Sequence, residues 1–122
     1  PEDWGSVPKG RFSTDGAIPE VSDSRCRFVK GWFQDTLHPS KLPTSESAVN
    51  IVHLDADLYS STLYVLATLN AHLKPGDILI FDEFAYVTDE FRAFLDWQSA
   101  YGRELAPLFA VNCGDVIAFK LV

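Results

Sequence analysis

The sequence predicts an α/β fold with two parallel central strands and a C-terminal antiparallel hairpin. Two runs of strand length, residues 49–55 and 77–82, are apolar enough to be covered on both faces, as the strands of a parallel sheet are. A helical pattern lies between them, which is the connection that two parallel strands need. Residues 107–122 combine strand, turn and strand signals, which indicate a β-hairpin.

The chain has the length and composition of one small globular domain or part of a larger one. It contains 122 residues, of which 47% are hydrophobic, and this composition is globular rather than disordered. The sequence starts at Pro1 and contains no methionine. We therefore expect a single truncated domain over residues 1–122, with a long loop region at 1–25 and an α/β core at 26–122.

Charge and cysteine content exclude several classes of partner and location. The formal net charge of −7 argues against nucleic acids and anionic membranes, because both select basic surfaces. No apolar run reaches the roughly 18 residues of a membrane span, and no signal peptide opens the chain. Cys26 and Cys113 belong to no larger cysteine framework. They predict two reduced thiols in a cytoplasmic protein.

The N-terminal part carries the weaker structural signals. Residues 1–25 are rich in Pro, Gly, Ser and Asp without any period, which predicts a long loop. Residues 26–33 (CRFVKGWF) are typical of a short strand. Residues 35–47 are polar and hold two prolines, so we expect at most a short helical turn at their start.

The remaining elements follow in alternation. Residues 60–62 offer hydroxyl groups that cap a helix, whose leucines recur at helical spacing until the Lys-Pro-Gly stop at 74–76. After the second strand, residues 88–90 cap another helix with acids in its first turn. Its apolar face is expected to consist of Phe91, Phe94, Leu95 and Tyr101, interrupted by Gln98, and Gly102 is expected to end the helix. The hairpin turn is expected at residues 112–115.

Both central strands end in acidic residues. Asp55 and Asp57 follow the first strand, and Asp82 and Glu83 follow the second. The carboxyl ends of parallel strands meet at one edge of the sheet, where ligands bind in open α/β folds. Like charges gathered there raise one another's pKa values or recruit a hard cation such as Mg²⁺ or Ca²⁺. A single acid at a strand end more often caps the next helix, whereas two acidic pairs at successive strand ends are more specific for a site, so a shared site and simple capping remain alternatives.

Other common site motifs are absent from the sequence. No His or Cys spacing indicates zinc, and neither a glycine-rich phosphate loop nor a Gly-x-Ser-x-Gly motif occurs. His53 lies within the first apolar run, so we expect a core position for it rather than a catalytic one.

Several blocks of sequence resemble the macrocin O-methyltransferase family, a group of class I S-adenosylmethionine-dependent methyltransferases. Their order and spacing match as well, and the blocks are VKGWFQDTL (29–37), LDADLYSST (54–62), KPG (74–76) and IFDEF (80–84). The opening PEDW and the segment FSTDG (12–16) resemble the loop after the family's second strand. The resemblance implies a Rossmann-like fold, of which this chain holds the C-terminal part.

The resemblance also implies an activity and a metal site. Members of the family transfer a methyl group from S-adenosylmethionine to a hydroxyl of a sugar or other small molecule, with a divalent cation such as Mg²⁺. By similarity, Asp55, Asp82 and Glu83 are candidate metal ligands. Such a metal would lower the pKa of the substrate hydroxyl and hold its oxygen in line with the methyl group. Asp55 and Asp57 are then candidate catalytic residues, with Asp57 orienting the substrate or accepting its proton.

The resemblance covers only part of the family's cofactor-binding site, the part that meets the adenine ring. Gly31 and Trp32 lie where enzymes of this class meet the adenine ring, so both are candidate cofactor-binding residues. The family's first strand, glycine-rich turn and ribose-binding acid have no counterpart in residues 1–122. We therefore expect the isolated chain to be inactive and to bind S-adenosylmethionine without useful affinity.

The family's strand order, 3-2-1-4-5-7-6, implies an exposed sheet edge in this chain. Without strands 1 and 2, the strand at 49–55 has an unpaired edge, and such edges invite pairing with another strand. Residues 27–30 would pair with residues 49–54, or a second copy would cover the edge. We favour the second solution, which predicts a homodimer or a higher homo-oligomer.

Two other classes of function remain open. The first is a non-catalytic truncated remnant that serves as an oligomerisation or interaction module. The second is another Asp-x-Asp metal enzyme, such as a phosphatase or a nucleotide-sugar transferase. A phosphatase motif requires a small residue and Thr after its second acid, where this chain has Leu58 and Tyr59.

Overall fold

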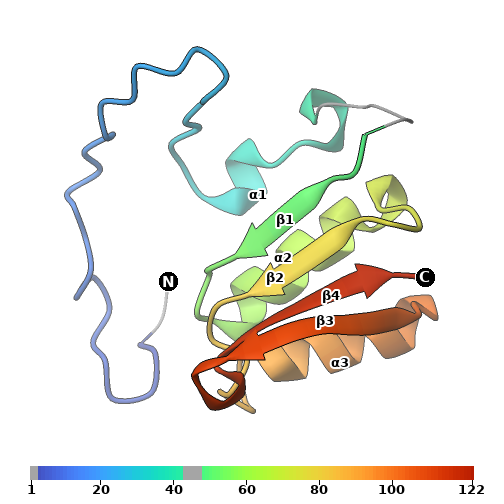
Figure 1. Ribbon diagram of the computed structural model, residues 1–122. Coiled ribbons are helices and arrows are strands. Elements are labelled where there is room, and N and C mark those ends of the chain that lie inside the picture. The colour runs from blue at the N-terminus through green and yellow to red at the C-terminus, as the bar shows by residue number, and fades with distance from the viewer. Residues whose placement is uncertain (1–2, 43–47) are drawn as a thin grey trace.

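The computed structural model describes residues 3–42 and 48–122. Residues 43–47, which end the polar segment expected at 35–47, lie outside the described residues. The elements are α1 (Phe33–Thr36), the 3₁₀ turn η1 (Pro39–Lys41), β1 (Ile51–Leu54), α2 (Tyr59–Leu69), η2 (Asn70–His72), β2 (Ile78–Phe81), α3 (Glu90–Tyr101), β3 (Leu105–Val111), η3 (Asn112–Gly114) and β4 (Val116–Leu121) (Figure 1).

The four strands form one mixed sheet in the order β1-β2-β4-β3. β1 and β2 are parallel, and their register places Ile51 opposite Ile78 and Leu54 opposite Phe81. β4 runs antiparallel to β2 and to β3. The α/β fold, its parallel pair joined by a helix and its C-terminal hairpin are confirmed.

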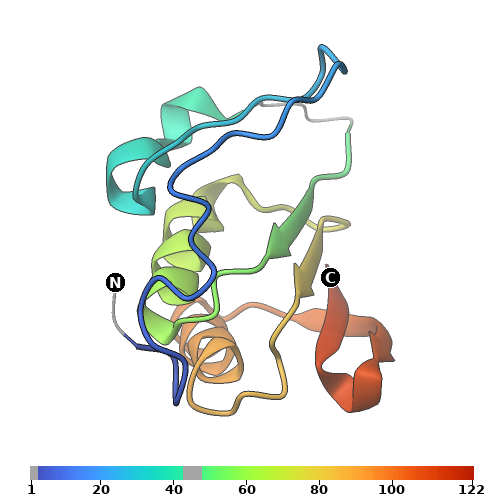
Figure 2. The same ribbon diagram turned by 90° about the vertical axis from the view of Figure 1, so that its left-hand side faces the viewer.

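Both long helices cover the same face of the sheet. α2 and α3 pack against each other, and Figure 2 shows them together on one side of the strands. Leu66, Leu79, Phe81 and Trp97 are fully shielded from solvent between these layers. Burial of such side chains stabilises a fold by about 1.5–3 kcal/mol each. The strand ends that carry the acids therefore emerge from the best-packed part of the chain.

β1 is less buried than the sequence predicts. Val49 is 59% exposed and Ile51 66% exposed, so the expectation that residues 49–55 are covered on both faces is wrong. The reason is the position of β1 at the edge of the sheet, where helices cover one face only. His53 is also exposed rather than a core residue, for the same reason.

The strand expected at residues 26–33 is not formed. Residues 26–30 are neither helix nor strand, and α1 begins at Phe33. A strand needs a neighbour for its backbone groups, and no strand in the described ranges pairs with this segment. Val29 is accordingly 72% exposed. The expected pairing of residues 27–30 with 49–54 does not occur either, because β1 pairs with β2 alone among the described residues.

α2 begins earlier than its hydroxyl residues suggest. Its N-cap residue is Leu58, and no side chain caps the helix, so the hydroxyls of residues 60–62 lie within the first turn. Thr62 is fully buried there. The predicted end of the helical segment is confirmed, since η2 stops before Lys74 and Gly76 adopts a φ of 95°.

α3 has the predicted extent but a different buried face. It ends at Gly102, whose φ of 61° is left-handed. Phe94 is buried as expected, but Leu95 and Tyr101 are 41% and 48% exposed. The other buried residues of the helix are Glu90, Ala93 and Trp97. The face is rotated because Trp97, rather than Gln98 and Tyr101, completes the apolar stripe around Phe94.

The cysteines and the lengths of the helices agree with the sequence analysis. Cys26 and Cys113 are both free and exposed, as predicted. Within residues 3–42 and 48–122, every helix is too short or too polar to cross a lipid bilayer.

Candidate active site

The predicted acids lie at one edge of the sheet. β1 ends at Leu54 and β2 at Phe81, and these two residues are register partners. The Asp82 backbone N–H donates to the Leu54 carbonyl at 3.1 Å, which ties the two strand ends together. Asp55 and Asp82 therefore leave the sheet side by side, because the strands are parallel and in register.

These acids influence one another electrostatically. Burial and then the charges of Asp55 and Asp82 raise the pKa of Asp57. Burial also raises the pKa of Glu83 to about 7, and neighbouring acids, Asp115 first among them, add to that effect. Mutual repulsion of carboxylates in a partly desolvated place is characteristic of functional sites.

The carboxylates do not converge on one centre. Among the residues that the structure describes, no three or more Asp, Glu, His or Cys side chains are grouped so as to hold a metal ion. Asp82 instead faces His53, with 3.5 Å between Oδ1 and Nε2. The donor chemistry of this edge suits a hard cation, since it consists of carboxylate oxygens, but the side-chain arrangement is not that of a formed site.

Glu90 connects the two acidic strand ends. It is the first residue of α3 and is fully buried. One carboxylate oxygen accepts the backbone N–H of Ala56 at 3.3 Å, and the other accepts that of Glu83 at 3.1 Å. Burial raises the pKa of Glu90, and the two N–H donors oppose that effect in part. One carboxylate thus holds in place two loops that are far apart in the sequence.

A first cleft contains the candidate cofactor residues. It has a volume of about 450 Å³ and is lined by Gly31, Trp32, Phe33, Gln34, Asp55, Ala56, Leu58, Ser60 and Ser61. Gly31 adopts a φ of 146°, and a Cβ there would lie 2.6 Å from the Thr36 methyl carbon, so this position requires glycine. The structure therefore brings Gly31 and Trp32 to the same cleft as Asp55.

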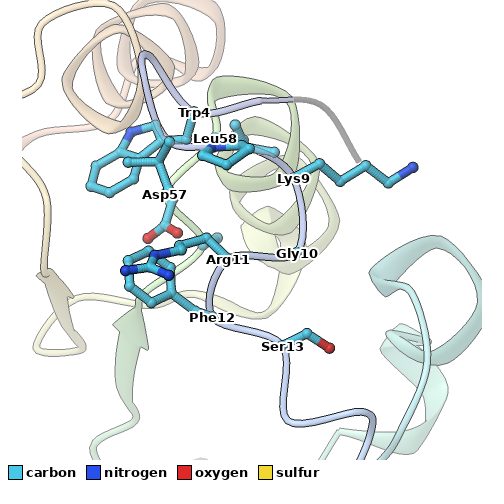
Figure 3. A pocket seen from close by; sticks show the side chains of 11 residues that line it. Trp4, Lys9, Gly10, Arg11, Phe12, Ser13, Asp57 and Leu58 are labelled. Carbon is cyan, nitrogen blue, oxygen red and sulfur yellow. The ribbon is translucent and has the colours of Figure 1, made fainter.

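A second cleft lies beside Asp57. Its volume is about 210 Å³, and it is lined by Trp4, Val7, Pro8, Lys9, Gly10, Arg11, Phe12, Ser13, Ala56, Asp57 and Leu58 (Figure 3). Most of these residues belong to the N-terminal segment, which Figure 1 shows in blue beyond the edge of the sheet. The loop region expected at 1–25 therefore supplies one wall of a cleft at the acidic edge.

Residues 55–58, which we call the partition loop, separate the two clefts. Ala56 and Leu58 line both of them, whereas Asp55 lines the first and Asp57 the second. Asp57 adopts a left-handed φ of 56°, a conformation that Asp tolerates better than most residues. The local backbone of this loop thus places successive acids toward different clefts.

The N-terminal segment contains a local turn and makes an aromatic contact with the loop after β2. Trp4 and Val7 exchange two backbone hydrogen bonds, at 3.0 and 2.8 Å. The ring centroids of Trp4 and Tyr86 lie 4.8 Å apart, and Tyr86 belongs to the loop after β2. Trp4 thus lines the second cleft and also contacts the β2–α3 connection.

Sequence reasoning missed several of these residues. Glu90 carries the ordinary signal of an acid in the first turn of a helix, and only the folded chain shows which amides it binds. Trp4 and Phe12 belong to the segments PEDW and FSTDG, which resemble a loop of the family, but neither residue was assigned to a site, and Arg11 carries no pattern beyond its basic character. Loops of that length in compact domains are usually functional, so the length of the loop and its resemblance to the family's loop were the signals that pointed to this segment.

Comparison with known proteins adds a family to this geometry. The family model described as macrocin-O-methyltransferase (TylF) matches residues 7–117. The protein named 8-demethyl-8-(2,3-dimethoxy-alpha-L-rhamnosyl)-tetracenomycin-C 4'-O-methyltransferase, from Streptomyces olivaceus, is 42% identical over 81 residues, which cover 66% of this chain and 29% of that protein. Demethyldecarbamoylnovobiocin O-methyltransferase from Streptomyces niveus is 31% identical over 83 residues, or 63% of this chain and 30% of that protein.

Among solved structures, that of the O-methyltransferase NovP has the same fold. It superimposes with a TM-score of 0.69 at 23% identity, over 83% of this chain and 39% of that chain. This chain thus spans less than a third of the length of the two curated relatives. Since the family model matches residues 7–117, which include all four predicted acids, the first cleft and every lining residue of the second cleft except Trp4, the chain belongs to the macrocin-O-methyltransferase family.

Proposed function

We propose that this chain is part of an S-adenosylmethionine-dependent O-methyltransferase that methylates a hydroxyl of a sugar-bearing small molecule. The observation that carries the proposal is the pair of clefts on the two sides of the partition loop, because group transfer requires two bound molecules to meet at one set of polar groups. The relatives support it, since both are named O-methyltransferases and the name of one includes a rhamnosyl group.

The first cleft is the proposed place of the adenine end of the cofactor. When bound, S-adenosylmethionine supplies the methyl group. Trp32 lines this cleft and is 60% exposed, and an exposed indole ring can stack on a flat base. The 122 residues contain no Gly-x-Gly-x-x-Gly turn, so contacts at the adenine end carry the binding and we expect the affinity of this chain to be weak.

We assign Asp55, Asp82 and Glu83 to a divalent cation such as Mg²⁺. Their donor atoms are carboxylate oxygens, which hard cations prefer, and a cation would relieve the repulsion among the acids of this edge. Binding would require the three carboxylates to turn toward a common centre. A cation bound there lowers the pKa of a coordinated hydroxyl.

Asp57 is the proposed proton acceptor and orienting residue for the acceptor hydroxyl. It lines the second cleft, while Asp55, two residues earlier in the partition loop, lines the first. A carboxylate in that place accepts a hydrogen bond from a hydroxyl and then its proton.

The cofactor assignment can be tested with the indole N–H signals of the three tryptophans. Trp32 lines the first cleft, Trp4 lines the second, and Trp97 is fully buried in the core. We expect S-adenosylhomocysteine to shift the Trp32 signal with an affinity in the millimolar range and to leave Trp97 unchanged. Methionine alone is the control and should shift neither. A Trp32 signal that stays in place up to the solubility limit of the ligand would refute this assignment.

The cation assignment has a separate test. Mn²⁺ should broaden the backbone amide signals of Asp55, Asp82 and Glu83 before those of other residues. Asp82→Asn should weaken this effect about tenfold or more, because a ligand is lost. Asp35→Asn, an exposed acid of α1 outside both clefts, is the matched control and should leave the effect unchanged. Uniform broadening along the chain would argue against the site.

A second candidate function is an oligomerisation module without catalysis. The exposed residues Val49 and Ile51 at the edge of the sheet favour it, since such edges pair with other chains. It is compatible with the proposed homodimer but predicts that neither cleft binds a ligand.

For the cellular location of the protein we propose the cytoplasm, because both cysteines are free and exposed and free thiols are typical of reducing compartments.

A further inference from the structure

We propose that Glu90 is a positioning residue of the active site, which sets the spacing between two acidic loops although it lines neither cleft. These loops are the partition loop after β1 and residues 82–83 after β2. The carboxylate of Glu90 bonds to Ala56 in the first loop and to Glu83 in the second. The inference rests on the proposed methyltransferase function and adds to it a residue that acts through others.

The hydrogen bonds of Glu90 differ from those of an ordinary acid in the first turn of a helix. An acid in that place usually interacts with the dipole or the free N–H groups of its own helix. The Glu90 carboxylate instead accepts amides that lie 34 and 7 positions earlier in the chain, at 3.3 and 3.1 Å. Capping of α3 therefore does not explain these two bonds, whereas a link between two loops does.

This link requires a carboxylate. Two N–H donors need two acceptor atoms, and an ionised carboxylate supplies both, whereas the side chain of glutamine supplies one acceptor and one donor group. Glu90 is fully buried, and the charges of Asp55 and Asp57 repel it. Burial of a carboxylate near like charges is unfavourable. The two amides are the compensation that the described structure provides for this charge.

α3 gives Glu90 a rigid support. Glu90 is the first residue of the helix, and Phe94 and Trp97 anchor the same helix in the core. The ring of Phe94 packs edge-on against that of Phe81 at the end of β2, with 5.5 Å between the ring centroids. The core of the fold, rather than the loops themselves, thus holds the carboxylate in place.

The bond to Ala56 controls how the partition loop presents its acids. Ala56 lies between Asp55 and Asp57, which line different clefts. Its N–H donates to Glu90, and its carbonyl accepts the Leu58 N–H at 2.6 Å. Asp57 adopts a left-handed φ of 56° between these two bonds, and such a conformation persists where surrounding contacts determine it. Loss of the Glu90 bond would free one side of the turn that carries Asp57.

The bond to Glu83 fixes the second acidic loop relative to the first. The ladder between β1 and β2 ends with the bond from the Asp82 N–H to the Leu54 carbonyl, at 3.1 Å, and Glu90 continues the connection beyond that point. A misplacement of about 1 Å can lower the rate of a reaction about 100-fold. The spacing that Glu90 sets therefore matters to the proposed transfer.

Relaxation dispersion of the backbone amides tests the proposal in the full chain. Glu90→Gln keeps the size of the side chain but leaves one of the two amides without an acceptor. We expect microsecond-to-millisecond exchange to appear together at the amides of Asp55, Asp57 and Glu83. Quiet amides in this variant, or exchange in only one of the two loops, would overturn the proposal.

Asp77→Asn is the matched control for a general loss of stability. Asp77 is also a fully buried acid, but it lies directly before β2, at the end of that strand opposite to the acidic edge. This variant should leave the amides of both acidic loops unchanged. Equal exchange in the Glu90 and Asp77 variants would show a general loosening of the fold and would contradict the proposal.

Mn²⁺ binding gives a second measurement, which a change in overall stability does not move. Glu90→Gln should weaken the Mn²⁺-induced broadening at Asp55 and Glu83 about tenfold, as the loss of a group that orients metal ligands does, and Asp77→Asn should not. An unchanged Mn²⁺ affinity in Glu90→Gln would refute the positioning role. If Mn²⁺ broadens no signal selectively in the unmodified chain, the cation assignment fails, and the relaxation measurement alone decides the role of Glu90.

Discussion

The two ends of the parallel pair β1–β2 are each held by a buried carboxylate, but the two carboxylates are compensated differently. Asp77, directly before β2, accepts hydrogen bonds from the backbone and side-chain nitrogens of Asn50 and from both nitrogens of Lys74, at 2.9–3.0 Å. Glu90, at the opposite end, accepts only the backbone N–H groups of Ala56 and Glu83. The described structure gives it no cationic partner.

Their pKa values move in opposite directions for this reason. Burial alone would raise the pKa of Asp77, but the bonds from Asn50 and Lys74 outweigh it and lower the pKa to about 2. Burial dominates at Glu90 and raises its pKa, with further repulsion from nearby acids. Proteins leave charges uncompensated mainly at functional sites. The comparison therefore predicts a structural role for the Asp77 end and supports the functional role proposed for the Glu90 end.

Removal of Glu90 should have the largest effect. Glu90→Ala leaves two amides without an acceptor, each at a cost of about 1–3 kcal/mol, and we expect the free energy of unfolding to fall by about 2–4 kcal/mol. Urea unfolding measures this fall, and hydrogen exchange at Ala56 and Glu83 should accelerate more than elsewhere.

Two further variants separate the role of Glu90 from a general loss of charge. Glu90→Gln keeps one acceptor atom and should be intermediate. Glu104→Ala, at an exposed acid, should change stability by less than about 0.5 kcal/mol. If Glu90→Gln proves as stable as the unmodified chain, the two hydrogen bonds do not position the loops and the comparison fails.

Asp77 should produce a smaller effect with a different pH dependence. Its folded-state pKa of about 2 lies below the ordinary value of 3.8, so its stabilisation is complete above that ordinary value and is lost as the pH falls toward 2. The shift corresponds to about 2 kcal/mol. Asp77→Asn should therefore be less stable by about that amount at pH 7, and the difference should narrow in acid.

Thermal unfolding between pH 7 and pH 2 tests the prediction for Asp77. Asp35→Asn serves as the control, since Asp35 is an exposed acid and should not change the profile. A constant difference between the Asp77 variant and the unmodified chain at all pH values would show that packing, rather than charge, is lost.

The N-terminal segment should contribute less to stability than either carboxylate. Trp4→Ala removes the contact with Tyr86, and aromatic pairs of this kind contribute about 0.5–1.5 kcal/mol. We expect faster proteolysis within residues 3–13 and a loss of no more than about 1 kcal/mol overall. Trp32→Ala, at a residue that is 60% exposed, should change neither quantity. Unchanged proteolysis of Trp4→Ala would mean that other contacts hold the segment.

The smallest effect on stability is expected for a substitution in β1, the outermost strand of the sheet. The same substitution should change the oligomeric state. We predict a homodimer through β1, which sedimentation at micromolar concentration would detect. Ile51→Lys should give a monomer, because a charge on an edge strand blocks pairing, with stability changed by less than about 0.5 kcal/mol. Leu108→Lys, on β3 at the other edge, should remain dimeric. A monomeric unmodified chain would refute the prediction.

The order of elements in the core could be predicted because it depends on local pattern. Residues 77–82 and the helices on either side of them carry periodic apolar residues, and burial of those residues decides their conformation. The acids Asp55 and Asp82 were placed at one edge correctly for a related reason, since parallel strands in register bring their ends together. The segment at 26–33 has a comparable strand signal, but no strand in the described part of the chain pairs with it, and a strand requires a neighbour.

What the sequence by itself determined is therefore the α/β class, the parallel pair, the hairpin, the family and the edge where the acids gather. Only the tertiary structure decided that β1 is exposed at an edge, that Glu90 ties two loops together and that residues 4–13 wall a second cleft beside Asp57. The physical reason is the distance along the sequence between the residues that interact. Periodicity and strand ends are written in neighbouring residues, whereas the amides that Glu90 accepts and the ring that holds Trp4 lie in segments brought together only by folding.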